Sequence, residues 1–274
     1  ATLLPDDAGV VILLGGSQII NANTGISTTA ALPWPQSKSY YGGLIKATGA
    51  DFINCRKGCE FMKYDYPNNS SFEGCEFYEN ASFIPISGSD NKTGGVTIWD
   101  CEGINFKKNL FTNLDSYGIL GIDFSCDVTE GNIFKNVNIG ISARATYEYS
   151  SNINVMGSTD PTKKNKFENN LYHIYSNNLD YNEGLMIEQN SFVNGVVGIV
   201  INNSTKFKVD KNAFYNHETA INVNATGGFQ NSVACNSIGL GCSGIEINGL
   251  NSYFQFIDNT FENYKYDLDL QSGS

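Results

Sequence analysis

The stretch KVDKNAFYNHETAINV, residues 208–223, contains the two patterns that decide the fold. It carries an Asn-x-Phe-x-Asn motif at residues 212–216 and then alternates apolar and polar side chains up to Val223. Alternation with a period of two is typical of a β-strand that buries one side. Asn between such runs is a turn residue. The stretch therefore predicts short strands that are separated by tight corners.

The same motif returns along the chain, which indicates a repeat protein. It reads NLFTN from residue 109, NIFKN from 132, NKFEN from 165, NSFVN from 190, NAFYN from 212 and NTFEN from 259. Weaker copies place an apolar residue at the same central position, which we call the anchor. Most anchors are 22 to 25 residues apart, a period that is typical of stacked structural units. The anchors are Phe52, Phe77, Phe111, Phe134, Phe167, Phe192, Phe214, Ile238 and Phe261.

Apolar pairs at i, i+2 surround the anchors and define the unit as a set of strands. Ile221 and Val223 follow one anchor, whereas Leu185 and Ile187 precede another. No stretch shows the i, i+3, i+4, i+7 pattern of an amphipathic helix. Short strands of this kind can bury their apolar sides only by coiling and stacking. The sequence therefore predicts an all-β parallel β-helix, a solenoid of about 9–11 coils that forms a single domain over residues 1–274.

The motif itself has a structural interpretation. In a stacked solenoid each corner lies directly above the same corner of the previous coil. Asn side chains there can hydrogen-bond along the stack, and Asn tolerates the left-handed conformation of a tight corner. The anchor Phe points inward and stacks on the Phe of the next coil. We expect these Asn residues to support the fold rather than to bind a ligand.

The two longest gaps between anchors contain polar insertions, near residues 86–95 and 156–164. These segments are expected to protrude as loops. Neither end of the sequence shows an obvious cap for the solenoid, so we expect the domain to belong to a longer surface protein.

The residue eight positions after each anchor is predicted to point outward, so that these residues form a column on one face of the solenoid. This column mixes acidic, polar and apolar residues, so it has neither the regular Thr of an ice-binding face nor the clustered carboxylates and cations of a catalytic groove. Asp123 is expected to join it through a shifted coil. The column contains Glu60, Pro85, Ser142, Tyr175, Val200, Asn222, Glu246 and Asp269.

Composition excludes several classes of partner. A net charge of −11 argues against nucleic acid and against an anionic membrane surface. No apolar run is long enough to span a membrane, and we expect no membrane insertion. The two histidines, His173 and His217, fall in different repeats, and no Cys-x-x-Cys pair exists, so we expect no metal site and no cofactor.

Seven cysteines leave at least one thiol unpaired. Cys75, Cys101 and Cys126 recur at about one per coil, which favours a stack of buried thiols. Cys235 and Cys242 flank a Gly-rich corner and are candidates for a disulfide, which would fit an extracytoplasmic chain.

The repeats resemble the right-handed parallel β-helix proteins, the architecture of pectate lyases, polygalacturonases and many surface proteins. Within this class, residues 42–80 (GGLIKATGADFINCRKGCEFMKYDYPNNSSFEGCEFYEN) are similar to large β-helix surface proteins of Bacteroidota that are exported and attached by a C-terminal sorting domain. That sorting domain is absent from this sequence. The resemblance implies a right-handed helix and an extracellular or cell-surface location, and it leaves the function open.

Signatures of the enzymes of this architecture are missing. Polygalacturonase-like hydrolases carry clustered Asp residues, a Gly-His-Gly and an Arg-x-Lys, none of which is present. Pectate-lyase-like elimination needs an Arg or Lys base beside calcium-binding carboxylates, and the chain has only Arg56 and Arg144. Arg144 with Tyr147, Glu148 and Tyr149 is the best lyase arrangement available, and a solvated loop is the alternative. We therefore assign no catalytic residue.

A binding role fits the sequence better than catalysis. Aromatic faces flanked by planar polar side chains recognise sugars, and one aromatic group follows two consecutive anchors. We expect this group to line a shallow carbohydrate-binding surface, with the covering of neighbouring loops as the alternative. The candidate residues are Tyr147, Tyr149, Tyr175, Tyr181, Arg144 and Glu148.

The prediction is thus a secreted or cell-surface β-helix with a binding, adhesive or scaffold role, whose partner is a polysaccharide or another surface protein. The alternative is a polysaccharide lyase or glycoside hydrolase whose cleft is built from loops.

Overall fold

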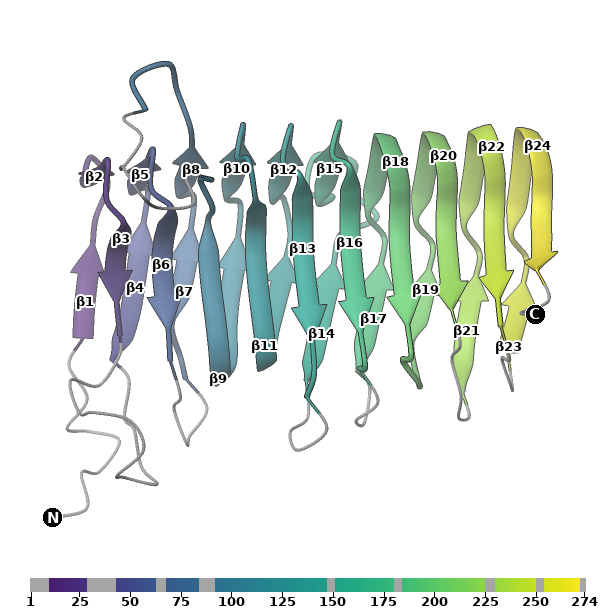
Figure 1. The fold of residues 1–274 in the computed structure, drawn as a ribbon, viewed down its shortest axis with the longest axis horizontal. Helices are drawn as coiled ribbons and strands as arrows, with labels where there is room; N and C mark the ends of the chain where they lie inside the picture. Colours follow the sequence, from purple (N-terminus) through teal and green to yellow (C-terminus); the bar gives the residue numbers. More distant parts are fainter. Residues whose placement is uncertain are drawn as a thin grey trace, which may run out of the picture.

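The protein is a right-handed parallel β-helix (Figure 1). The computed structural model describes residues 10–28, 43–62, 68–83, 92–146, 151–179, 184–224, 230–249 and 254–271. The chain winds through three strands per coil, and successive coils lie side by side along a rod that ends at β24 (Thr260–Gln271). Ten coils can be followed in the described residues, which confirms the predicted number. No described helix is long and apolar enough to cross a membrane.

The strands form three parallel sheets, one on each side of the coil. Sheet 1 contains β1 (Val10–Leu13), β4 (Leu44–Thr48), β7 (Ser71–Glu73), β14 (Asn152–Met156), β17 (Leu185–Glu188), β19 (Lys208–Asp210), β21 (Asn231–Ala234), β23 (Phe254–Ile257) and the last residues of β9 and β11. Sheet 2 contains β2 (Gln18–Ile20), β5 (Asp51–Ile53), β8 (Glu76–Tyr78), β10 (Leu110–Thr112), β12 (Ile133–Lys135), β15 (Lys166–Glu168) and the first residues of β18, β20, β22 and β24. Sheet 3 contains β3 (Thr24–Ser27), β6 (Lys57–Phe61), β13 (Ile139–Arg144), β16 (Tyr172–Asn177), the first parts of β9 (Val96–Lys107) and β11 (Tyr117–Thr129), and the later parts of β18 (Ser191–Asn202), β20 (Ala213–Asn224), β22 (Ser237–Asn248) and β24.

The anchor residues stack along the inside of sheet 2. Each anchor pairs with the anchor of the next coil, from Phe52 beside Phe77 to Ile238 beside Phe261. Consecutive Phe rings from Phe52 to Phe214 are stacked, with their centroids 4.5 to 4.9 Å apart. The predicted register of the repeat is therefore confirmed. This column fills the core with aromatic surface in the offset-stacked geometry that aromatic pairs prefer.

The first Asn of each motif lies at the corner between sheets 1 and 2 and is buried in every coil except the last, where Asn259 is half-buried. Asn190 Nδ2 donates to Asn212 Oδ1 in the next coil at 3.1 Å and to the carbonyl oxygen of Val155 at 2.9 Å. The backbone N–H of Asn190 donates to the same Asn212 oxygen at 2.9 Å. One side chain thus satisfies buried polar groups of the two neighbouring coils, as buried donors and acceptors require. We call this column the inner Asn row: Asn109, Asn132, Asn165, Asn190, Asn212, Asn236 and Asn259.

The second Asn of the motif forms an exposed column at the other end of sheet 2, the outer Asn row. Its members have left-handed backbones with φ between 54° and 60°, which Asn tolerates better than most residues. Their side chains also bond along the stack, with N to O distances of 2.8 to 3.2 Å. The row consists of Asn113, Asn136, Asn169, Asn194 and Asn216.

The two rows lead to a prediction about stability. Asn190→Ala is expected to lower the free energy of unfolding by roughly 2–3 kcal/mol, because it leaves buried donors and acceptors on neighbouring coils without partners. The matched control is Asn194→Gly, which removes only exposed bonds and which the left-handed φ of 55° tolerates. Urea unfolding of both variants measures the difference. Equal losses would show that the inner row contributes no more than the outer one.

Two residues that the spacing from the anchors predicts for the outward column, Pro85 and Asp123, do not lie in it. The outward column of sheet 3 contains Thr97 and Leu120 in its third and fourth coils, in place of Pro85 and Asp123. Pro85 lies outside the described residues, in the longer segment before β9. Asp123 lies at a corner with φ of 52° and is buried. Extra residues precede β9, and the pairing of β11 with β9 is irregular near Phe124. In these two coils the outward residue therefore does not lie eight residues after the anchor.

The insertion near residues 156–164 is exposed over residues 159–163, as predicted, while residues 86–91 of the other insertion lie outside the described part. Cys75, Cys101 and Cys126 are buried as predicted, and burial raises the pKa of each thiol. They do not form one column, because Cys101 pairs with Phe124 and Cys126 with Ile104.

Candidate functional site

A shallow groove runs along the corner between sheets 2 and 3, parallel to the rod axis. It consists of three adjoining hollows with volumes of about 280, 570 and 480 Å³ from the N-terminal to the C-terminal side. The first two hollows share Lys92, and the second and third share Asn169 and Leu171. The groove extends from β3 to β20, and we call it the axial groove.

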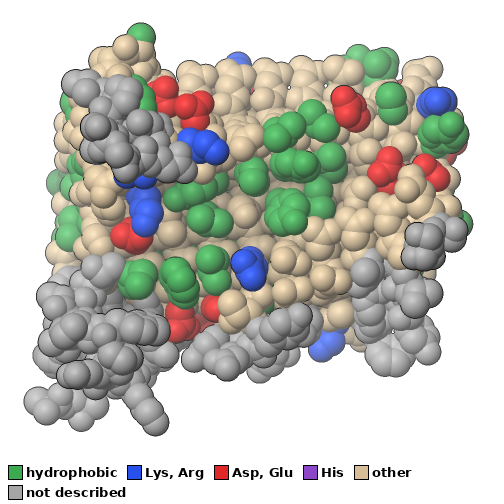
Figure 2. All heavy atoms as spheres, in the orientation of Figure 1, with side chains coloured by type: hydrophobic (Ala, Val, Ile, Leu, Met, Phe, Trp, Pro, Cys, Tyr) green, Lys and Arg blue, Asp and Glu red, His purple; other side chains and the backbone are tan. Residues whose placement is uncertain are grey.

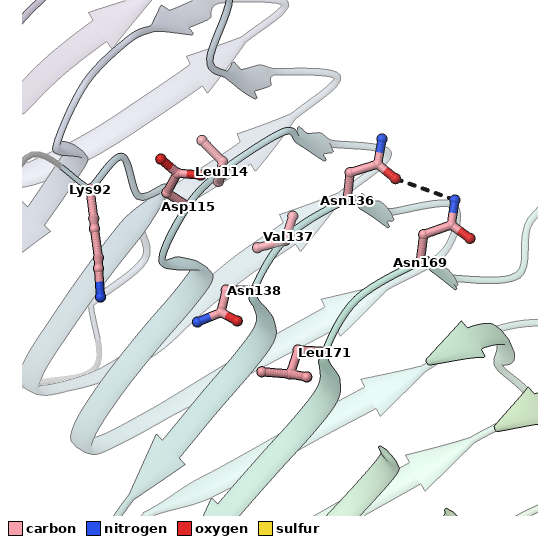
Figure 3. Close-up of a pocket in the computed structure, with 8 residues that line it drawn as sticks. All are labelled: Lys92, Leu114, Asp115, Asn136, Val137, Asn138, Asn169 and Leu171. Carbon is pink, nitrogen blue, oxygen red and sulfur yellow. Dashed lines mark hydrogen bonds between the residues drawn. The ribbon is translucent and has the colours of Figure 1, made fainter. Parts of the chain in front are cut away.

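The central hollow shows how the repeat builds this groove (Figure 3). Asn136 and Asn169 of the outer Asn row form one side and are joined by a hydrogen bond of 3.2 Å. The left-handed backbone at each Asn turns the chain, so the next residue, Val137, is buried at the base of the hollow. Asn138 and Leu171 lie on the opposite side, and Leu171 is 42% exposed. The result is an apolar base between planar amide side chains.

The outer surface of sheet 3 continues directly from the groove. The register aligns outward side chains in columns across the coils. Two consecutive inward residues, such as His173 and Ile174, separate the first column from the second, and regular alternation separates the second from the third. One column runs through Tyr117, Ile139, Tyr172 and Val197. The next runs through Thr97, Leu120, Ser142 and Tyr175 and continues to Val200, which is buried although the sequence predicted it to be an outward side chain. The third runs through Trp99, Ile122, Arg144 and Asn177.

These columns create a patch of aromatic and aliphatic surface. Figure 2 shows hydrophobic side chains gathered over the middle strands of this side, with Lys and Arg side chains toward the N-terminal coils. Trp99 is 49% exposed, and Tyr117, Tyr172 and Tyr175 are half-buried. We call these four residues the aromatic face.

Contacts fix the orientation of the tyrosines. The rings of Tyr172 and Tyr175 meet edge to face with centroids 6.0 Å apart. The hydroxyl of Tyr175 accepts a hydrogen bond from Asn202 Nδ2 at 3.0 Å, and that of Tyr117 lies 2.6 Å from Thr97 Oγ1. Burial raises the pKa of Tyr117, so its hydroxyl is uncharged at neutral pH. The aromatic face therefore presents tyrosine rings whose orientation is fixed by ring contacts or by hydrogen bonds of their hydroxyl groups.

The structure brings together two of the residues predicted from the sequence. Tyr175 pairs with Ser142, two residues before Arg144 on the neighbouring strand, so Tyr175 and Arg144 share one surface. Tyr147, Glu148, Tyr149 and Tyr181 lie outside the described residues.

Tyr117 and Tyr172 were not predicted from the sequence. Tyr117 lies six residues after the anchor Phe111 and Tyr172 five residues after Phe167, so a second outward column at this spacing would have included both. It also missed Trp99, because the insertion before β9 hides the register of that strand.

A second group of chemically active side chains is buried beside the groove. His173 and His217 lie two coils apart, yet their Nε2 atoms are 2.9 Å apart. They meet because Gly195 stands between them without a side chain; a Cβ there would lie 2.6 Å from His173 Nε2. Asn170 Nδ2 lies 2.9 Å from His173 Nδ1 and donates to it. The assumption that histidines in different repeats stay apart is wrong here.

Burial lowers the pKa of both histidines, to about 4 for His217, and the charge of His217 further lowers that of His173. Both rings are therefore neutral at pH 7. The described residues contain no group of three or more His, Cys, Asp or Glu side chains arranged to hold a metal ion.

Among the described residues that line the groove, no two carboxylates form a pair of the kind that hydrolysis requires. Its described acidic residues are Asp115 in the central hollow and Glu218 in the C-terminal hollow. Asp123 accepts hydrogen bonds from the backbone and side chain of Thr146, 2.6 and 2.7 Å long, which occupies its carboxylate.

Cys235 and Cys242 are exposed free thiols. They lie on either side of the Ser237–Gly239 part of sheet 2, at opposite corners of one coil. A disulfide between them stays a prediction from the sequence.

Strand register and groove thus define a class, the right-handed parallel β-helix with a groove and an aromatic face on one side. No protein-family model matches the sequence, and no curated protein matches it. Among solved structures, the surface adhesin PfbA of Streptococcus pneumoniae is similar at 12% identity with a TM-score of 0.41, over 95% of this chain and 85% of that chain.

Two further structures are similar at the same low level. ORF18 of Geobacillus virus E2 matches at 12% identity with a TM-score of 0.38, over 95% of this chain and 54% of that chain. The A-module of the mannuronan C-5 epimerase AlgE4 of Azotobacter vinelandii matches at 13% identity with a TM-score of 0.32, over 98% of this chain and 91% of that chain. Similarities of this size assign neither a family nor an activity.

Proposed function

We propose that the protein is a secreted or cell-surface β-helix that binds an extended carbohydrate chain in the axial groove and on the adjoining aromatic face. The observation that supports this most is the alignment of the hollows and the aromatic columns along the same side of the rod. Coils repeat every ~4.8 Å along the rod, so equivalent side chains recur at the regular intervals that a polymer of similar units can exploit.

The chemistry of the surface fits a sugar chain. Sugars present apolar C–H faces and a rim of hydroxyl groups, which aromatic rings and amides complement respectively. Tyr172 and Tyr175 supply rings, while the outer Asn row and Asn138 supply donors and acceptors. Tyr147, Tyr149, Tyr181, Glu148 and Arg144 remain part of the same proposal as further candidate contacts to the sugar chain.

Location and partner are part of this proposal. We infer an extracellular or surface-attached domain of a longer protein, which is what the expected resemblance of residues 42–80 to exported Bacteroidota surface proteins implies. An adhesive or scaffold role toward another surface protein is the competing form of binding. It would use the same exposed aromatic face.

A glycan array tests the function. We expect the unmodified protein to bind a subset of glycans, and Tyr172→Ala/Tyr175→Ala to lower the affinity at least about tenfold, because central tyrosines commonly carry much of the binding energy. The control is Tyr215→Ala, which removes a 53% exposed ring from sheet 2. Circular dichroism checks that each variant is folded. Binding that is unchanged in the double variant, or equally reduced in the control, would contradict the proposed surface.

The enzyme alternative predicts turnover. A polysaccharide lyase would produce unsaturated ends that absorb in the ultraviolet, and a hydrolase would produce reducing ends. The glycans that bind on the array are therefore also incubated with the protein and assayed for both products. Product formation that Arg144→Gln abolishes would replace the binding role by a catalytic one.

A further inference from the structure

The N-terminal hollow of the axial groove gathers cations in an acidic protein. The chain has 17 Lys and Arg residues against 28 Asp and Glu, and its net charge is −11. Arg56, Lys57 and Lys92 nevertheless line one hollow of about 280 Å³ together with Tyr117. Figure 2 shows Lys and Arg side chains beside the N-terminal end of the hydrophobic patch. The local charge is thus opposite to that of the whole chain.

Arg56 is held in place but has unused donor capacity. Its Nη1 donates to Asn23 Oδ1 at 2.7 Å, which fixes one end of the guanidinium. Its Nε is buried and has no hydrogen-bond partner among the described residues. Buried donors are almost always hydrogen-bonded in folded proteins, so this N–H is available to an acceptor on a ligand. The Nε edge of a guanidinium is the edge that binds a carboxylate or sulfate through two parallel hydrogen bonds.

The neighbouring groups complete an anion site. Lys57 forms an ion pair with Glu60, while Lys92 forms none within the described part of the chain. The hydroxyl of Tyr117 is bonded to Thr97 Oγ1 and carries no charge. The three cationic side chains that line the hollow thus face one acidic ion-pair partner, Glu60. Two further acidic side chains lie next to Lys92: Glu79, which accepts a hydrogen bond from Thr93 Oγ1 at 2.6 Å, and Asp115, which lines the adjoining central hollow.

We propose that this hollow binds an anionic group, a carboxylate or a sulfate, carried by an acidic saccharide whose chain continues along the axial groove. The choice of a saccharide as carrier rests on the proposed function, whereas the anion site rests on Arg56 and its surroundings alone. The hollow and the central part of the groove share Lys92, so one ligand can occupy both. Arg56 would select the acidic unit, and the aromatic face would hold the units that follow.

The anion site is tested first with inorganic sulfate. The unfolding temperature is measured at increasing sodium sulfate and at sodium chloride of equal ionic strength, for the unmodified protein, Arg56→Gln and Lys135→Gln. Lys135 lies on sheet 2 beside Glu168, outside the groove, so its variant is a charge-matched control. General salting effects of sulfate are common to all three proteins, whereas a specific site adds stabilisation that depends on ligand concentration.

We expect sulfate to raise the unfolding temperature of the unmodified protein and of Lys135→Gln by more than it raises that of Arg56→Gln. An identical sulfate response in all three proteins would overturn the anion site and leave these cations as an ordinary solvated surface. Arg56→Lys retains the charge but loses the two-pronged geometry, so its response should be intermediate.

The saccharide is tested on the glycan array at physiological salt, where exposed charges are screened. We expect acidic glycans to bind more tightly than neutral glycans with the same backbone. Arg56→Gln should lower the affinity for the best acidic glycan at least about tenfold, the loss typical of one charged hydrogen bond or more. Equal binding of acidic and neutral partners, or full affinity in Arg56→Gln, would overturn the inference.

The two experiments separate the inference from the proposed function. A sulfate response that depends on Arg56, without binding of any glycan, retains the anion site and removes the saccharide and the carbohydrate function. Binding of neutral glycans that depends on Tyr172 and Tyr175, without a sulfate response, retains the carbohydrate function and removes the anion site.

Discussion

Phe214→Ala is expected to lower the free energy of unfolding by roughly 3–5 kcal/mol, the cost of removing a buried aromatic ring and leaving a cavity. Phe214 is 2% exposed, and its ring stacks on that of Phe192 at a centroid distance of 4.7 Å. Gly198 also packs against it, since a Cβ there would lie 3.0 Å from the ring. Chemical denaturation followed by circular dichroism measures the loss.

The adjacent residue provides the control for this prediction. Tyr215 lies on the same strand, points outward and is 53% exposed. Tyr215→Ala is expected to change stability by no more than about 0.5 kcal/mol, as is usual for surface positions. Hydrogen exchange should show the damage of Phe214→Ala in the two neighbouring coils, because each coil of a solenoid contacts only its neighbours. Similar losses in both variants would mean that the anchor column does not hold the coils together.

Acidification is expected to destabilise the protein through the buried histidine pair. Burial lowers the pKa of His217 to about 4 in the folded state, whereas an unfolded His titrates near 6.5. Between about pH 6.5 and pH 4 the unfolded chain therefore binds more protons, so stability falls as the pH falls. The difference corresponds to roughly 3 kcal/mol for His217, and His173, whose pKa is lowered further below its usual range, acts in the same direction.

The hydrogen bonds of the pair explain why it resists protonation. Asn170 donates to His173 Nδ1, so His173 carries its proton on Nε2 and donates it to His217 Nε2. His217 then carries its proton on Nδ1, which has no partner among the described residues. A further proton on His217 would have to enter between two rings whose Nε2 atoms are only 2.9 Å apart. A further proton on His173 would have to replace the hydrogen bond that Asn170 donates to its Nδ1.

Urea unfolding from pH 7.5 to pH 4 measures this dependence. His173→Gln/His217→Gln is the comparison, because the carboxylates titrate equally in both proteins. We expect the unmodified protein to lose more stability than the double variant between pH 6.5 and pH 4. Parallel curves would show that the two histidines are not buried as a neutral pair.

The register of the fold could be predicted because one motif determines two features at once. In Asn-x-Phe-x-Asn the Phe can only point inward, and the flanking Asn residues mark the corners on both sides. All nine anchors therefore fall in one column, including Ile238, which lacks the ring. The coil count follows directly from this column.

The candidate site was harder to predict for three physical reasons. The outward columns near Trp99 depend on how many residues an insertion leaves in the strand. The contact between His173 and His217 depends on Gly195 in the intervening coil, and the two histidines are 44 residues apart in sequence. The axial groove arises from the left-handed backbone at the outer Asn row, which sets the depth of the corner. The sequence could place Tyr175 and Arg144 on one surface because both lie on regular coils.

Hydroxyl-radical footprinting with and without the best glycan from the array tests the central claim most directly. The ligand is expected to reduce the oxidation of Trp99, Tyr172 and Tyr175, which lie on sheet 3, and to leave that of Tyr215 on sheet 2 unchanged. Protection of Tyr215 with no change on the aromatic face would contradict the assignment of the binding surface.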